Sequence, residues 1–229
     1  MALITPIHGE MSGSIAGNVY AHNKAGQYVR QRVVPTNPNT TFQQTKRTVF
    51  AALAQFWTNG LNDVERALWD DYAANVQVLN RQGNPMFLSG MNWFITVNTL
   101  QNAAGGTLIT AAPSVYSLDP LNPCTAAVVV ATQVMTLTFD DTQPWASEDG
   151  AFMLVQQGKV VNGAVNFFKG PFRVIGSLAG DSVTPQTSPN ASLSLQFLVS
   201  ATSAAYFRIR VIRADGRPST PQIIKASLS

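Results

Sequence analysis

The chain has 229 residues, of which 45% are hydrophobic and only 12% are charged. Soluble domains average about 25% charged residues, and the centres of protein interfaces are depleted in charge, so this composition favours a subunit of an assembly. The alternative interpretation is a β-rich domain in which Ser, Thr, Asn and Gln take the place of charges. The length allows one large domain or two small ones, and either can bury a core.

Features that the chain lacks disfavour some classes of protein. No window approaches the roughly 18 consecutive apolar residues that span a membrane, so no membrane partner is expected. The opening residues carry no basic stretch ahead of an apolar run, which disfavours a secretory signal. Cys124 is the single cysteine, so no internal disulfide is expected. Because glycosylation requires secretion, the sequons at Asn39 and Asn190 are interpreted as chance matches.

Residues 1–39 are rich in glycine and then extended. Glycines divide this segment into short β-prone pieces at Gly13, Gly17 and Gly26. Gln27–Val34 alternates like a strand, and Pro35 and Pro38 favour an extended backbone in the residues before them. The sequence therefore predicts an extended N-terminal arm over residues 1–39.

Residues 40–106 change to helical spacing and predict a small antiparallel helical module. Thr40 with Gln43, or Thr41 with Gln44, forms a capping box ahead of the first helix. The expected buried face of this helix consists of Val49, Leu53, Phe56 and Trp57.

Two more helices are predicted in this module. Asn59-Gly60 is expected to end the first helix, because glycine tolerates the left-handed conformation at a helix end. Asn62 is expected to cap the second helix, with Glu65 three positions later, and a third helix is predicted from about Ser89 to Leu100. The expected buried face of the second helix consists of Val64, Leu68, Tyr72 and Val76, with Trp69 and Ala73 beside them.

From about residue 113 the period of the apolar residues becomes two, which is typical of strands. Apolar side chains alternate with polar ones at Met135, Leu137 and Phe139, at Leu193, Leu195, Phe197 and Val199, and at Phe207, Ile209 and Val211. Hairpin-type turns occur at Asp149-Gly150, Asn162-Gly163 and Asp215-Gly216. The pattern predicts a β-sandwich of the immunoglobulin or fibronectin type over residues 113–229, without the cysteine pair. The expected fold class is α+β: an extended arm, a helical module and a sandwich.

No residue pattern points to catalysis, so the chain is interpreted as a non-enzymatic protein without a cofactor. His8 with Glu10 has the elements of a metal site or of half a relay, but a metal site needs several convergent ligands and the surrounding sequence supplies none. Cys124 precedes an apolar run and is expected to be a small core residue rather than an activated thiolate.

Three acidic pairs occur, at Asp70-Asp71, Asp140-Asp141 and Glu148-Asp149. Neighbouring carboxylates diverge on a strand or a helix, so these pairs do not predict acid–base catalysis. The last two pairs flank a loop whose oxygen atoms suit calcium, but no calcium-loop spacing is present. A solvated loop is the favoured interpretation, with a weak calcium site near Asp140–Asp149 left open.

Charge distribution offers candidate contact residues. No acidic residue occurs between Met11 and Asn62, whereas five basic residues do. So sparse a basic stretch favours an acidic patch on a protein over nucleic acid as the partner, and nucleic-acid folds and stacking motifs are absent. Arg30 and Arg32 are expected on one face of a strand. The candidate interaction residues are Tyr20, Tyr28, Arg30, Arg32, Lys46, Arg47, Arg208 and Arg210.

Several segments resemble a group of phage and prophage proteins. The connector from Arg30 to Thr40 reads Arg-x-x-Val-x-Pro-x-Asn-Pro-x-Thr, and it follows a glycine-punctuated opening and precedes a helix with Gln43-Gln44 and Arg47. Further similar segments are Gly13–Tyr20, Gly26–Arg30, Leu61–Trp69, Leu88–Phe94, Arg208–Val211 and Asp215–Ser219. The similarity covers residues 13–100, and the C-terminal segments more loosely.

This resemblance implies a structural component of a tailed-phage virion, on the head surface as a capsid-associated or decoration protein, or in the neck or tail. The implied partners are copies of the chain itself and other virion proteins, and the implied location is the virion, assembled in the host cytoplasm. The resemblance carries no functional residue over to this chain. The alternative function is a host-receptor or glycan-binding sandwich that uses exposed aromatics such as Trp145 and Phe167-Phe168, if these lie outside the core.

Overall fold

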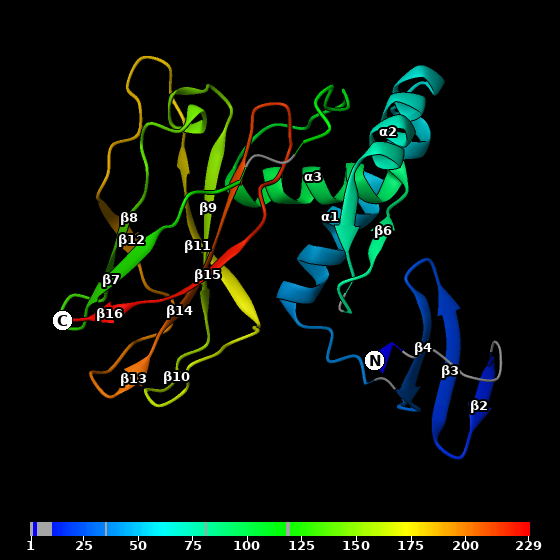
Figure 1. The fold of residues 1–229 in the computed structure, drawn as a ribbon, viewed down its shortest axis with the longest axis horizontal. Helices are drawn as coiled ribbons and strands as arrows, with labels where there is room; N and C mark the ends of the chain where they lie inside the picture. Colours follow the sequence, from blue (N-terminus) through cyan, green and yellow to red (C-terminus); the bar gives the residue numbers. More distant parts are fainter. Residues whose placement is uncertain (1, 4–10, 35, 81, 118–119) are drawn as a thin grey trace. The chain divides into compact units, whose positions relative to one another are not determined.

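The computed structural model describes residues 2–3, 11–34, 36–80, 82–117 and 120–229 (Figure 1). The fold is mixed α+β, with three α-helices and several antiparallel sheets among the described residues. The chain forms two compact units, Met1–Ile95 and Thr96–Ser229. The division lies inside helix α3, Gly90–Ala104, whereas the sequence predicted that the third helix belongs wholly to the helical module.

The expected extended arm is wrong for most of its described residues, because these form an antiparallel sheet. Its strands are β1 (Ala2–Leu3), β2 (Gly13–Ile15), β3 (Asn18–Asn23) and β4 (Gly26–Gln31), in the order β1-β4-β3-β2. The tight turn at Ala16-Gly17, where both residues have positive φ, reverses the chain and lets β2 pair with β3. The segment after β4 has no regular structure among its described residues until helix α1 begins.

Helix α1, Thr41–Asn59, begins with the predicted capping box, in which Thr40 and Gln43 exchange hydrogen bonds. Its end is at the predicted residue but for a different reason. Gly60 has φ −98°, in the right-handed region, so left-handed freedom is not what requires glycine here. A Cβ atom on Gly60 would lie 2.7 Å from the ring of Phe56. The glycine therefore makes room for the aromatic ring that packs over the helix end.

Helix α2, Asp63–Asn75, also begins with the predicted capping box, between Asn62 and Glu65. Its predicted buried face is partly wrong. Val64 is 70% exposed and Leu68 is 51% exposed. The predicted Tyr72 and Val76 are buried, and so are Trp69 and Ala73, which were predicted to lie beside that face. The large aromatic rings bury more apolar area than Val or Leu, so they set the rotation of the helix. A short hairpin follows, formed by β5 (Gln77–Leu79) and β6 (Pro85–Phe87).

An aromatic cluster forms the core of the first unit. The ring of Phe94, from α3, is completely buried and lies 6.2 Å from Phe56, 5.6 Å from Trp57 and 5.7 Å from Trp69, centroid to centroid. Tyr72 packs edge-on against Trp93, completing the cluster. Side chains from all three helices therefore meet around Phe94.

The second unit contains two four-stranded sheets that share one core. One has the order β11-β9-β14-β15, and the other β12-β8-β7-β16. Every neighbouring pair is antiparallel except β16 with β7, which is parallel. The strands are β7 (Thr125–Val129), β8 (Val134–Thr138), β9 (Phe152–Gly158), β11 (Phe172–Ala179), β12 (Asn190–Ser194), β14 (Tyr206–Ile212), β15 (Gln222–Lys225) and β16 (Ser227–Leu228), with a small extra pair, β10 (Val161–Asn162) and β13 (Ser203–Ala204).

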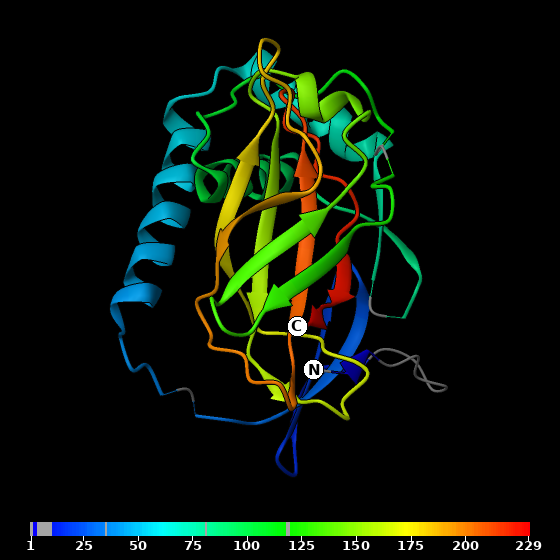
Figure 2. The same ribbon diagram turned by 90° about the vertical axis from the view of Figure 1, so that its left-hand side faces the viewer.

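The predicted alternation places the core correctly in most of these strands. Met135 and Leu137 of β8 and Phe207 and Ile209 of β14 are completely buried in one cluster, which both sheets contribute to. Figure 2 shows the green strands β7 and β8 passing in front of the yellow and orange strands of the other sheet. The apolar side chains between the two layers are what hold them together.

The predicted strand through Val199 ends early, at Ser194, because a buried side chain takes over the backbone hydrogen bonds. Gln157 is completely buried, and its Oε1 accepts from the N–H groups of Gln196 and Phe197, both at 2.9 Å. Its Nε2 donates to the Phe197 carbonyl at 2.7 Å. The chain can therefore leave the sheet without unpaired buried backbone groups at this point.

A second, smaller core explains why α3 extends into the second unit. Ala104, near the end of α3, packs with Leu154 of β9 and Ile212 of β14, on the sheet face opposite the main core. Ser177 of β11 donates a hydrogen bond to the Ala104 carbonyl at 2.8 Å. No helix in the described part of the chain is both long enough and apolar enough to cross a membrane.

Candidate functional site

The N-terminal sheet holds three of the candidate contact residues, Tyr20, Tyr28 and Arg30, and these three do not share one face. Tyr20 lies opposite Val29 and Tyr28 lies opposite Ala21, so the two tyrosines project from opposite faces of the sheet. Arg30 is exposed, on the face of Tyr28. Arg32 lies beyond the end of β4, where its N–H donates to the Gly17 carbonyl at 2.6 Å. The strand ends one residue before Arg32, so only Arg30 of the two arginines lies on the strand itself.

This sheet has almost no core of its own. Among its side chains whose burial is described, Gln27 is the only buried one, and it is polar. Its Oε1 accepts from the Met11 N–H at 3.1 Å, while its Nε2 has no hydrogen-bond partner among the described residues. Ile15 is 59% exposed, and both tyrosines are half-buried. A sheet of this size is stable when one apolar face is covered, so its side chains need a covering surface.

Helix α1 carries the next two candidate residues beside exposed aromatic rings. The ammonium of Lys46 lies 5.5 Å from the ring centroid of Phe42, which is 50% exposed. Arg47 donates to the side-chain oxygen of Asn37 at 2.9 Å and so ties the connector to the helix. Phe50 is 55% exposed, one turn beyond Lys46. The N-terminal half of α1 therefore presents a surface that is both apolar and cationic.

Strand β14 brings the last two candidates, Arg208 and Arg210, to the same sheet face, and both are half-buried rather than solvated. Arg208 donates to Gln156 Oε1 at 2.6 Å, and its guanidinium lies 4.9 Å from the ring centroid of Phe172. Burial lowers the pKa of Arg208. Burial, followed by the neighbouring charge of Arg208, lowers the pKa of Arg210. Two cations held close together on a partly buried face favour an anionic neighbour.

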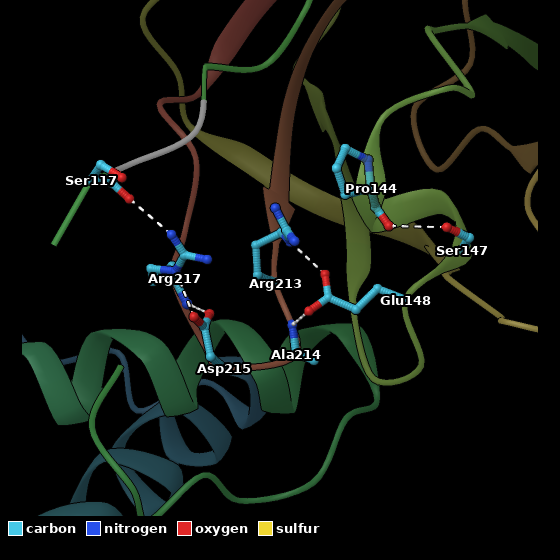
Figure 3. A network of polar contacts seen from close by, with 8 residues as sticks. All are labelled: Ser117, Pro144, Ser147, Glu148, Arg213, Ala214, Asp215 and Arg217. Carbon is cyan, nitrogen blue, oxygen red and sulfur yellow. Dashed lines mark hydrogen bonds and ion pairs between the residues drawn. The ribbon is translucent and has the colours of Figure 1, made fainter. Parts of the chain in front are cut away.

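A cavity of about 300 Å³ opens in the second unit, with an apolar wall that includes Pro144, Trp145 and Val211. Arg213 and Arg217 also line it, and Figure 3 shows how both are engaged. Arg213 pairs with Glu148. Arg217 pairs with Asp215 at 2.6 Å and donates to the Ser117 carbonyl at 3.1 Å. Both guanidinium charges are thus neutralised locally, so the cavity is not arranged as an anion site. Its ion pairs brace the turn after β14.

The acidic loop that suggested a weak calcium site uses its carboxylates as internal hydrogen-bond acceptors. Asp140 accepts from the N–H and hydroxyl of Thr142 and from Asn122, and these bonds lower the pKa of its carboxyl group. Asp149 accepts from the N–H and hydroxyl of Ser182. No group of three or more potential metal ligands gathers among the described residues. His8 and Glu10 lie outside the described residues.

The aromatic residues of the alternative receptor hypothesis are split between core and surface. Trp145 is 2% exposed and packs against Phe139, so it lies in the core. Phe168 is half-buried against Phe172 and Tyr206. Phe167 alone of the three is well exposed, at 66%. These side chains do not form one exposed patch.

Cys124 is a buried core residue, as the sequence predicted. Burial raises the pKa of its thiol from 9.0 to about 11. Between these values the unfolded chain loses the thiol proton while the folded chain keeps it, so stability is lost as the pH rises. The free energy of unfolding should therefore fall as the pH rises from 9 to 11.

A Cys124→Ala chain should therefore show a shallower loss of stability between pH 9 and pH 11 than the unchanged chain. Denaturant unfolding at a series of pH values measures the difference. Identical pH dependence of the two chains would show that the Cys124 thiol does not contribute to the loss of stability between pH 9 and pH 11.

Exposed apolar side chains on the helices were missed from the sequence. Val64 and Leu68 on α2 were assigned to a buried helical stripe because their spacing is helical, whereas Phe42 and Phe50 on α1 were assigned to no face. Spacing shows that a stripe is apolar and leaves open whether this chain or another molecule covers it. Searches against family models, curated proteins and solved structures found no match for this chain.

Proposed function

We propose that this chain is a structural subunit of a tailed-phage virion that acts through protein–protein assembly rather than catalysis. The observation that carries the proposal is the N-terminal sheet, in which the only side chain described as buried is the polar Gln27. The proposed partners are copies of the chain and other virion proteins.

The N-terminal sheet has almost no buried apolar side chains of its own among those described. Apolar burial is the main source of stability for a folded element, and strand pairing alone is marginal in water. Half-buried Val19, Tyr20, Tyr28 and Val29 gain this stability when a neighbouring molecule covers the faces that they occupy. The low proportion of charged residues, 12%, supports the same proposal, because it lowers the cost of covering the surface.

The virion setting is supported by the segments that resemble phage and prophage proteins. The connector from Arg30 to Thr40 leads into α1, and Thr40 and Gln43, two residues of the similar segments, form the capping box there. Within the proposal, the N-terminal sheet and the helices make the assembly contacts.

We also propose that the two sheets of the second unit form a sandwich of the immunoglobulin or fibronectin type. The strand orders support this proposal. In one sheet, the neighbours β7, β8 and β12 correspond in order to strands A, B and E of an immunoglobulin domain. In the other sheet, β9, β14 and β15 correspond to strands C, F and G. Strand β11 lies beside β9, as strand C′ lies beside C in variable-type domains. Such a module suits lateral packing or outward display on a particle.

The proposal is tested by purifying phage particles from a host that produces this chain and identifying their proteins by mass spectrometry. The expected result is the chain in a fixed ratio to the major particle proteins. Its absence from purified particles, together with its presence in the same lysate, would overturn the proposal.

A further inference from the structure

Two exposed helix faces of the first unit have opposite charge and similar length. The first is the α1 face, Phe42, Lys46 and Phe50, spaced four residues apart. The second is the α2 face, Val64, Leu68 and Asp71, spaced four and then three residues apart, which also places them on one side of a helix. Each places exposed apolar side chains beside one charged side chain. At about 1.5 Å per residue both faces span roughly 10–12 Å along their helices.

The two helices carry net charges of opposite sign. Helix α1 contains Lys46 and Arg47 and no acidic residue. Helix α2 contains four acidic residues and one basic residue, Arg66, which pairs with Asp63. Asp70 accepts from the Gly90 N–H at 3.1 Å, on another side of the helix. Asp71 is exposed and lies three residues after Leu68, a spacing that places the two side chains next to each other on the helix.

We propose that the α1 face of one copy of this chain docks on the α2 face of a second copy. Phe42 and Phe50 then pack on Val64 and Leu68, and Lys46 approaches Asp71. A second copy is the occupant that the charges favour, because the chain itself carries both complementary surfaces. Opposite charges at the contact select this pairing over α1 with α1 or α2 with α2, each of which brings like charges together. The inference rests on the proposed function and names the contact through which assembly proceeds.

A contact between two different surfaces is tested by damaging each surface in a separate chain. In full-length protein, Phe50→Asp damages only the α1 face and Leu68→Asp damages only the α2 face. Each variant alone is expected to lose self-association by tenfold or more, measured by analytical ultracentrifugation. An equal mixture is expected to form a 1:1 dimer, because the intact α2 face of the first variant meets the intact α1 face of the second.

A control variant and a charge-exchange pair keep the test decisive. Val183→Asp alters a side chain that is 85% exposed in the second unit, and it should associate as the unchanged chain does. Lys46→Glu and Asp71→Lys should each weaken association, and the two changes combined in one chain should restore it. Circular dichroism confirms that each variant is folded.

The inference is overturned if the Phe50→Asp and Leu68→Asp mixture stays monomeric, or if either variant alone associates like the unchanged chain. It is also overturned if the unchanged chain stays monomeric at all concentrations. In each of these cases, detection of the chain in purified particles would leave the proposed function standing, with other proteins as the occupants of both faces.

Discussion

A chain that lacks residues 1–39 is expected to be absent from assembled particles while its second unit remains folded. The removed segment contains the strand-rich surface whose apolar side chains have little burial of their own. The second unit keeps its independent core, in which Met135, Leu137 and Phe207 are completely buried. The expected loss of incorporation is therefore a loss of contacts and not a loss of fold.

Incorporation is measured by quantifying the truncated and unchanged chains in particles purified from cells that express both. Near-ultraviolet circular dichroism reports whether the second unit stays folded. Val183→Asp, a change in the second unit, is the control that should incorporate normally. Full occupancy of particles by the truncated chain would show that the segment has no part in assembly.

Replacing Phe94 with alanine is expected to destabilise the first unit by about 3–5 kcal/mol, because removal of a buried phenylalanine loses its burial and leaves a cavity. The Phe94 ring is completely buried and contacts rings from both other helices, Phe56 and Trp57 of α1 and Trp69 of α2. The loss should therefore affect all three helices together.

Denaturant unfolding followed by tryptophan fluorescence measures this change, because three of the four tryptophans, Trp57, Trp69 and Trp93, lie in the first unit. Phe167→Ala is the matched control, since that ring is 66% exposed, and it should change stability by less than about 1 kcal/mol. Equal effects of the two substitutions would show that the aromatic cluster is not the core of this unit.

Local signals in the sequence predicted the starts of the helices correctly. The capping boxes at Thr40 and Asn62 join residues three positions apart, so every interacting partner is visible in the sequence. The alternation of apolar and polar residues that predicted the strand at Met135 and Leu137 is likewise visible within a few neighbouring residues. These features need no knowledge of distant contacts.

Features decided by distant contacts could not be predicted in the same way. The rotation of α2 depends on Trp69 and Tyr72 meeting rings of α3, and the early end of β12 depends on Gln157 from another strand. The division of α3 between two units depends on Leu154 and Ile212, which lie far along the chain. Helical or strand periodicity carries no information about such partners.

For the candidate contact residues too, the sequence predicts what neighbouring residues decide and does not predict what distant contacts decide. Arg208 and Arg210 share a face because they are two residues apart on one strand, which periodicity predicts. Tyr20 and Tyr28 lie on opposite faces because of the register between β3 and β4, which only the turn at their junction sets. The exposure of Phe42 and Phe50 could not be predicted from spacing, since an apolar stripe looks the same whether it is covered by its own chain or by another.

Hydrogen exchange at the backbone amides of residues 13–31 is the most direct test of whether neighbouring molecules cover the N-terminal sheet. The rates are compared between the isolated monomer at low concentration and the chain within particles. We expect fast exchange in the monomer, where the sheet opens readily, and strong protection in particles, where partners cover it. Equally slow exchange in both states would show that the sheet is stable by itself, and would contradict the account.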